Sequence, residues 1–93
     1  MKSVFQKNKT CFFCNSTRGL HSHHIFEGTA NRRKSEQYGL KVWLCGPHHN
    51  LSNAGVHFNK TMDIELKQMA QRYFEANIGS RDYFIREFGK SYL

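Results

Sequence analysis

The chain has 93 residues, of which 39% are apolar and 14% aromatic, and its 14 Lys and Arg residues against seven Asp and Glu residues give a net charge of +7. This length leaves room for one domain, and the aromatic content argues against a disordered chain. No apolar run approaches the ~18 residues that a membrane-spanning helix needs, and the first residues have the charges of an export signal without its apolar stretch. We therefore expect a cytoplasmic protein that does not enter a membrane.

The positive charge is concentrated in one part of the chain. Residues 1–60 contain nine Lys and Arg against two Asp and Glu, whereas residues 61–93 contain five of each. All six histidines and all three cysteines also lie in the first sixty residues. A basic half favours an anionic partner such as a nucleic acid, and a basic surface that only maintains solubility is the alternative.

The first half of the chain predicts a short arm, a knuckle and a strand. Residues 1–10 are polar and indicate a loose N-terminal arm. Residues 11–19 are typical of a tight knuckle, and residues 20–26 of a short strand. We expect a loop over residues 27–39. This loop carries a basic run of Arg32, Arg33 and Lys34.

The second half predicts one more strand and then helices. Alternation of Leu40, Val42 and Leu44 indicates a strand over residues 40–44. Pro47 fits the first position of a short helix that Gly55 would close. Apolar side chains recur at helical spacing over residues 62–74. A last short helix, with Ser80 as N-cap and Gly89 at its end, carries Tyr83, Phe84 and Phe88.

Two ligand pairs predict a structural zinc site. Cys11 and Cys14 are separated by two residues, as are Cys45 and His48, and such pairs on turns can reach one tetrahedral ion. A zinc ion would stabilise the fold, because a chain of 93 residues can form only a small hydrophobic core. The alternatives are buried thiols, or a Cys11–Cys14 disulfide with Cys45 left over. The odd cysteine count and the expected cytoplasmic location argue against the disulfide.

The remaining histidines predict a second site. His49 and Asn53 lie four residues apart on the expected short helix and could hold one divalent ion, with His23 as a third ligand from the strand. His24 is then left as a general base, because an imidazole can take a proton from water near neutral pH. The alternative is a set of surface histidines or histidines packed against the zinc site. The pleat of a strand sends residues 23 and 24 to opposite faces, so both serve one site only if the strand ends or bends there.

These motifs resemble a known family. Cys11-x2-Cys14, His23-His24-Ile25 and Leu44-Cys45-x2-His48-His49-x3-Asn53 look like the HNH (His-Me finger, ββα-metal) nucleases, in the zinc-supported form common in phage genomes. The resemblance implies an α+β fold, a zinc-stapled ββα-metal finger with C-terminal helices. The match spans residues 11–53, and the likeness covers most of the chain. We expect a single domain over residues 1–93, with an arm over 1–10, the knuckle and finger over 11–59 and supporting helices over 60–93.

The resemblance also implies roles for the residues. His24 matches the general base, and His23, His49 and Asn53 match the ligands of a catalytic cation, most often Mg²⁺ or Mn²⁺. The zinc ligands match Cys11, Cys14, Cys45 and His48. The activity implied is a metal-dependent DNA endonuclease that leaves 5′-phosphate and 3′-hydroxyl ends, in the host cytoplasm if the chain is phage-encoded, with phage packaging or recombination proteins as further partners.

One departure from the family concerns the residue that orients the base. The family has an Asn at the position of residues 38–40, where this chain has Tyr38-Gly39-Leu40, and Asn31 is only a weak substitute. A backbone carbonyl or another side chain must then do this work. Without it, the alternative function is a non-catalytic zinc-containing DNA-binding module of a phage DNA-processing complex, and an RNA nuclease is a third possibility.

Other side chains are expected to contact the substrate. Arg32, Arg33 and Lys34 could clamp DNA phosphates beside the scissile bond, and a solvated loop is the alternative. Contacts of this kind position the nucleic acid without reading its sequence. The roles of His57 and His21 stay open between the metal, a phosphate and a structural contact.

Overall fold

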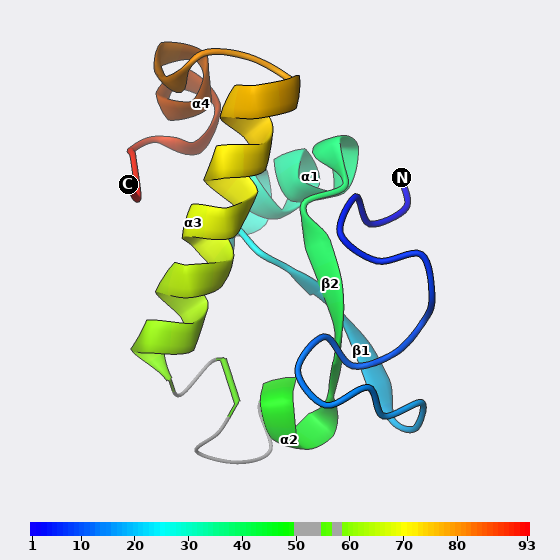
Figure 1. The fold of residues 1–93 in the computed structure, drawn as a ribbon. Helices are drawn as coiled ribbons and strands as arrows, with labels where there is room; N and C mark the ends of the chain where they lie inside the picture. The colour runs from blue at the N-terminus through cyan, green and yellow to red at the C-terminus, as the bar shows by residue number, and fades with distance from the viewer. Residues whose placement is uncertain (50–54, 57–58) are drawn as a thin grey trace.

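The structure is a computed structural model that describes residues 1–49, 55–56 and 59–93. The elements follow one another as β1 (Leu20–His24), α1 (Thr29–Tyr38), β2 (Lys41–Cys45), α2 (Gly46–His49), α3 (Lys60–Asn77) and α4 (Arg81–Phe88). Figure 1 shows α3 running along one side of the sheet, with α1 and α4 towards one end of the molecule and α2 towards the other. The chain thus has the expected α+β class, and both strands and the two C-terminal helices form where the sequence predicts them.

Within the described residues the sheet consists of β1 and β2, which pair antiparallel. The register places His24 opposite Lys41 and Leu20 opposite Cys45. Val42 and Leu44 are buried beneath the sheet, as their alternation predicts. Cys45 is the last residue of β2, and α2 begins at the next residue. The Cys45 thiol therefore lies at the start of the short helix.

The segment between the strands corrects our expectation of a loop over residues 27–39. Residues Thr29–Tyr38 form the helix α1 instead. Its sequence is almost entirely polar, and Ser35 is the buried residue of the helix, so the apolar spacing that signals a helix is missing. Gly39 ends the helix in the left-handed conformation with φ 71°, and a Cβ there would lie 2.5 Å from the carbonyl oxygen of Lys2.

Ser35 fastens α1 to the end of β1. Its Oγ accepts a hydrogen bond of 3.1 Å from the backbone N–H of Phe26 and donates one of 3.2 Å to the carbonyl of the same residue. Both residues are fully buried. Ser35 therefore satisfies the N–H and C=O groups of Phe26, which lies beyond the end of β1. These hydrogen bonds attach α1 to the protein although the helix has no apolar stripe.

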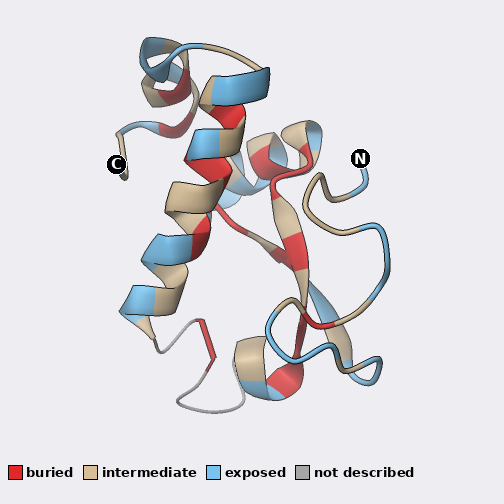
Figure 2. Cartoon of the chain, in the orientation of Figure 1, coloured by how far each residue is buried: buried red, intermediate tan, exposed pale blue. Residues whose placement is uncertain are grey.

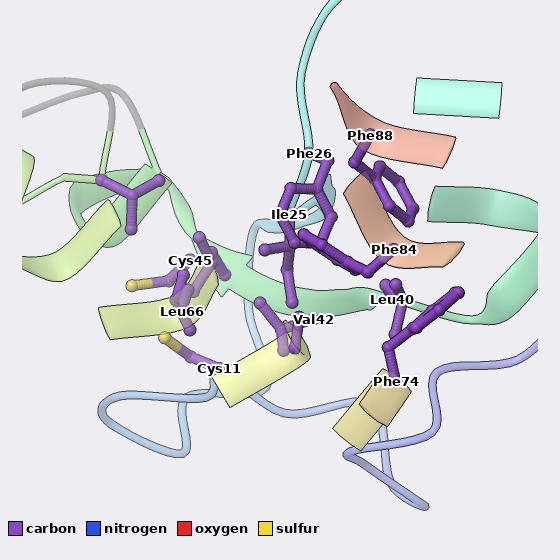
Figure 3. Close-up of a cluster of buried hydrophobic side chains, with 13 residues drawn as sticks. Cys11, Ile25, Phe26, Leu40, Val42, Cys45, Leu66, Phe74, Phe84 and Phe88 are labelled. Carbon is purple, nitrogen blue, oxygen red and sulfur yellow. The ribbon is translucent and has the colours of Figure 1, made fainter. Parts of the chain in front are cut away.

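The C-terminal helices enclose an aromatic core. Leu66, Ala70 and Phe74 of α3 are buried. Figure 2 shows buried segments on α3, on β2 and on the C-terminal part of the chain. Phe74 meets Phe84 of α4 edge to face at 5.3 Å between ring centroids. Figure 3 shows this aromatic group at one end of the buried cluster and the thiols of Cys11 and Cys45 at the other. The side chains of Asn59 and Ser80 cap the two helices.

The N-terminal segment expected to be a loose arm lies along β2. The backbone N–H of Val4 donates to the carbonyl of Gly39 at 3.0 Å, and the side-chain oxygen of Gln6 accepts from the backbone N–H of Trp43 at 2.8 Å. Phe5 packs against Tyr73 of α3. This segment therefore protects an edge of the sheet that would otherwise be open.

In the part of the chain that the structure describes, no helix combines the length and the apolar character needed to cross a membrane.

Candidate functional site

Four side chains from three segments meet at the end of β2. They are Cys11, Cys14, Cys45 and His48. Their ligand atoms lie within 4.8 Å of one another, and the three cysteines form no disulfide. Cys11 and Cys14 come from the knuckle before β1, where the backbone N–H of Asn15 donates to the carbonyl of Cys11 and closes the turn. The cluster could hold a metal ion such as zinc.

The distances in this cluster fit a tetrahedral ion. A zinc ion about 2.3 Å from sulfur and about 2.0 Å from nitrogen places its ligand atoms roughly 3.5–3.8 Å apart. The Sγ atoms of Cys14 and Cys45 are 3.7 Å apart, and Sγ of Cys11 is 3.6 Å from Nδ1 of His48. The distance from Sγ of Cys45 to the same nitrogen is shorter, at 3.1 Å, so only a small outward movement of the imidazole is needed.

The environment of the thiols also suits a cation. Burial opposes ionisation of Cys11, but backbone hydrogen bonds from Cys45 and from residues of the knuckle outweigh it and lower the pKa of this thiol to about 6. Burial raises the pKa of the Cys45 thiol, and the neighbouring thiols add to this effect. The Cys11 thiol therefore ionises readily, whereas burial and the neighbouring thiols disfavour ionisation of Cys45. A bound cation would stabilise both thiolates.

The other histidines meet in a cavity beside the edge strand β1. The cavity has a volume of about 360 Å³. It is lined by Ser22, His23, His24, Glu27, Arg32 and His49. His23 and His24, which the pleat should separate, both reach this cavity because β1 ends at His24. The structure thus brings both adjacent histidines and the helical His49 to one hollow in the surface.

His49 lies between two histidines of β1. Its ring centroid is 5.4 Å from that of His23, and its Nδ1 lies 2.8 Å from Nδ1 of His21. His21 and His23 are two residues apart and so share one face of the strand. His23 is 3% exposed, whereas His21 is exposed at the surface. His21, whose role the sequence left open, is therefore a direct neighbour of the helical histidine.

His24 is held by a carboxylate that sequence reasoning missed. Its Nε2 lies 2.8 Å from Oε1 of Glu36 near the end of α1. The carboxylate also accepts from the ammonium group of Lys41, the residue opposite His24 in the sheet. The sequence left open which group orients this imidazole, and the structure places the side chain of Glu36 there. Glu36 could be found only with α1 in place, because the helix brings residue 36 back to the strand end.

The charge on Glu36 determines how His24 carries its proton. The ammonium group of Lys41, the amino group of Met1 and the imidazole of His24 hold the pKa of Glu36 well below its usual range. An ionised carboxylate can only accept, so neutral His24 keeps its proton on Nε2 and donates it to Glu36. Nδ1 of His24 is then the nitrogen with the free electron pair.

The basic residues of α1 separate into two groups. Arg32 lines the histidine cavity and Arg33 is exposed on the helix. Lys34 points away to α4, where its ammonium group donates to the carbonyl of Glu87 at 2.6 Å and lies 3.5 Å from the carboxylate of Glu87. Asn31 lies in the first turn of the same helix. Arg32 is therefore the member of the basic run that is placed beside the histidines.

A second, lysine-lined cavity is formed by the N-terminal segment and the two strands. Its volume is about 280 Å³. It is lined in part by Lys2, Lys7, Lys9, Lys41 and Trp43. The ammonium group of Lys9 lies 4.6 Å from the centre of the Trp43 ring. Ser22 lines both cavities, so the lysine-rich surface adjoins the histidine cavity.

Two acidic residues near His23 were also missed. The ligand atoms of His23, Glu27 and Asp63 lie within 4.8 Å of one another. Asp63 is forty residues from His23 in the chain, in a helix that the sequence indicated only as support. Two other residues assigned to the site, Asn53 and His57, lie outside the described residues.

Comparisons with protein families, with curated proteins and with solved structures found no match to this chain.

Proposed function

We propose that this protein is a metal-dependent endonuclease that hydrolyses DNA phosphodiester bonds with His24 as the general base. The observation that carries the proposal is the meeting of His23, His24, His49 and Arg32 in one cavity of about 360 Å³. The cavity is lined by three imidazoles, one guanidinium and the carboxylate of Glu27. Such a set suits a phosphate substrate that needs a proton acceptor and a bound cation.

His24 supplies the proton acceptor in this proposal. Its Nε2 donates to Glu36, and Nδ1 takes a proton from a water molecule as the water oxygen attacks the phosphorus. The bond from phosphorus to the 3′ oxygen breaks, so one fragment carries a 5′-phosphate. The leaving 3′ oxygen takes up a proton from solvent water and becomes a hydroxyl. Glu36 keeps the ring in the required orientation and stabilises the imidazolium that forms. It takes the part of the family's middle Asn, which this sequence lacks.

A divalent cation held beside His23 would neutralise the charge that develops on the phosphate. Arg32 lines the same cavity and can pair with a second phosphate oxygen. The lysine-lined cavity shares Ser22 with the histidine cavity and offers a path for the neighbouring phosphates. Contacts of this type favour binding with little sequence preference.

The cysteine cluster has a structural role in this proposal. Zinc held by Cys11, Cys14, Cys45 and His48 would tie the knuckle to the end of β2. With all four positions filled by side chains, such a site has no open position for a substrate. The arrangement would make the fold a zinc-stapled ββα-metal finger, with β1, β2 and α2 as its core and α1 inserted between the strands.

The test is a plasmid nicking assay with Mg²⁺, Mn²⁺, Co²⁺ or Ni²⁺. We expect the wild-type protein to convert supercoiled DNA to nicked or linear forms, and His24→Ala to reduce the rate about 10²–10⁴-fold. Gln37→Ala, at an exposed position of α1 beside Glu36, is the matched control and should cut like the wild type. Circular dichroism and zinc content establish that each variant is folded.

Two other outcomes would assign a different function. DNA binding without cleavage under all four metals would make the protein a non-catalytic zinc-containing DNA-binding module. Cleavage of a labelled RNA but not of DNA would make it an RNA nuclease. Equal cleavage by wild type and His24→Ala would exclude His24 as the base.

A further inference from the structure

Three side chains that are distant in sequence converge on one side of the histidine cavity. His23 comes from β1, Glu27 from the turn that follows β1, and Asp63 from the first turn of α3. One ligand atom of each lies within 4.8 Å of the other two. His23 is 3% exposed and the side chain of Asp63 is 20% exposed, whereas Glu27 is exposed, so the group extends from a buried histidine to the surface.

The two oxygens of Asp63 have different surroundings. Oδ2 lies 2.8 Å from the ammonium group of Lys67, one turn further along α3. Oδ1 is buried and has no hydrogen-bond partner among the residues that the structure describes. A buried carboxylate oxygen without a partner is unfavourable, and a bound cation would satisfy it.

We propose that His23, Glu27 and Asp63 form a divalent-cation site, with Mn²⁺ or Mg²⁺ as the class of ion it takes. One imidazole nitrogen and two carboxylate oxygens are a ligand set for hard or borderline divalent cations, and the set contains no thiolate. The two candidate metal sites of the chain thus differ in the chemistry of their ligands.

The surroundings of the site support this assignment. His23 and Glu27 both line the cavity of about 360 Å³, so an ion held by them keeps positions open towards the space where a phosphate or water would lie. The bond from Lys67 fixes Oδ2 of Asp63 and leaves Oδ1 as the ligand. Lys67 also lowers the net negative charge of the group, which tempers the repulsion between the two carboxylates in the metal-free protein.

This ligand set differs from the one that the family resemblance implies. His23 is common to both, but Glu27 and Asp63 replace His49 and Asn53. The consequence is that α3 takes part in the site, and the cation links the helix to the strand. The role of the ion in cleavage rests on the proposed function, whereas its binding does not.

The experiment measures Mn²⁺ binding without DNA, on protein that carries one zinc per chain. Electron paramagnetic resonance of free Mn²⁺ gives the dissociation constant for the wild type and for Asp63→Asn, Glu27→Gln and Glu65→Gln. We expect Asp63→Asn and Glu27→Gln to weaken binding at least about tenfold. Glu65→Gln removes an exposed acid two residues from Asp63 and should bind like the wild type.

Glu27 is exposed, so Glu27→Gln keeps the test valid even if Asp63→Asn disturbs the start of α3. The proposal is overturned if the wild type binds no Mn²⁺ at millimolar concentration. It is also overturned if both variants bind as tightly as the wild type, or if all three carboxylate variants lose affinity equally, since binding would then follow net charge alone.

The outcomes separate this inference from the proposed function. If Mn²⁺ binding depends on Asp63 and Glu27 but the protein cleaves no nucleic acid, the cation site is supported and the proposed nuclease function is excluded. If the wild type cleaves DNA and Asp63→Asn binds Mn²⁺ and cleaves DNA as the wild type does, the nuclease function is supported and the cation has other ligands.

Discussion

Nε2 of His24 lies 2.8 Å from Oε1 of Glu36, across the space between the end of β1 and the end of α1. The same carboxylate lies 2.8 Å from the ammonium group of Lys41, which is the partner of His24 in the sheet. The orientation of this imidazole is therefore fixed by a helix and by the neighbouring strand together. If the proposed function holds, these contacts determine which ring nitrogen is available to a substrate.

Replacement of Glu36 tests this arrangement. We expect Glu36→Ala to lower the single-turnover cleavage rate about 10–100-fold, because His24 loses the acceptor that fixes its tautomer. Glu36→Gln keeps an oxygen acceptor and should lose less. DNA affinity, measured by fluorescence anisotropy without a divalent ion, should change little in either variant. A rate in Glu36→Ala equal to that of the wild type would show that the bond has no part in catalysis.

Loss of a cysteine tests the metal cluster. We expect the Cys45→Ser variant to hold no tightly bound metal and to unfold without a cooperative thermal transition, because the thiol is buried and the proposed ion would join the knuckle to β2. Removal of the ion from the wild type with a strong chelator should have the same effect. Thr17→Ala, at an exposed position of the knuckle, should retain both properties. Unchanged zinc content in Cys45→Ser, measured by mass spectrometry of the metal, would contradict the assignment.

Ser35 tests how α1 is attached. Ser35→Ala leaves the buried N–H and C=O groups of Phe26 without their partners, so we expect the free energy of unfolding to fall by about 1–3 kcal/mol. Urea denaturation of the zinc-loaded protein measures it. Gln37→Ala on the exposed side of the helix should change the same quantity by less than about 0.5 kcal/mol. A similar effect in both variants would mean that the two hydrogen bonds contribute little.

Glu87 predicts a dependence of stability on pH. The hydrogen bond from Tyr38 and the charge of Lys34 lower the pKa of Glu87 in the folded protein. A lowered folded pKa means that this stabilisation is present above the unfolded value of about 4.5 and is lost as the pH falls through the folded value. We therefore expect the difference in unfolding free energy between wild type and Glu87→Gln to decrease as the pH falls below the unfolded pKa of about 4.5.

The matched control for this prediction is Tyr38→Phe, which removes the hydroxyl that donates to Glu87. In the Tyr38→Phe background, the pH dependence of the Glu87→Gln effect should become smaller. Comparison of variants at each pH removes the common contribution of metal loss in acid. A difference between wild type and Glu87→Gln that stays constant from pH 6 to pH 3 would disagree with the lowered pKa.

Local signals predicted much of the fold. The alternation of Val42 and Leu44 indicated β2, and the apolar spacing that includes Leu66 and Phe74 indicated α3. These elements bury apolar side chains on one face, so their pattern is visible in the sequence. The paired spacing of Cys11 with Cys14 and of Cys45 with His48 was equally local, and these side chains lie together in the structure.

Contacts that depend on the position of a whole helix were not predictable in this way. α1 has no apolar stripe, and it packs through Ser35 instead, so the sequence indicated a loop. With the helix missing, Glu36 could not be placed beside His24. Asp63 was overlooked for a related reason. Its proximity to His23 depends on how α3 packs against β1, and no local sequence pattern indicates that packing.

His48 and His49 are consecutive residues of α2, and they face different groups of side chains. His48 belongs to the cysteine cluster and His49 to the wall of the histidine cavity. If the cysteine cluster holds zinc as proposed, a chain that has not acquired this ion would lack the anchor that sets the position of that wall. Maturation would be ordered, with zinc supply limiting how many copies become competent to take up a second cation or a substrate.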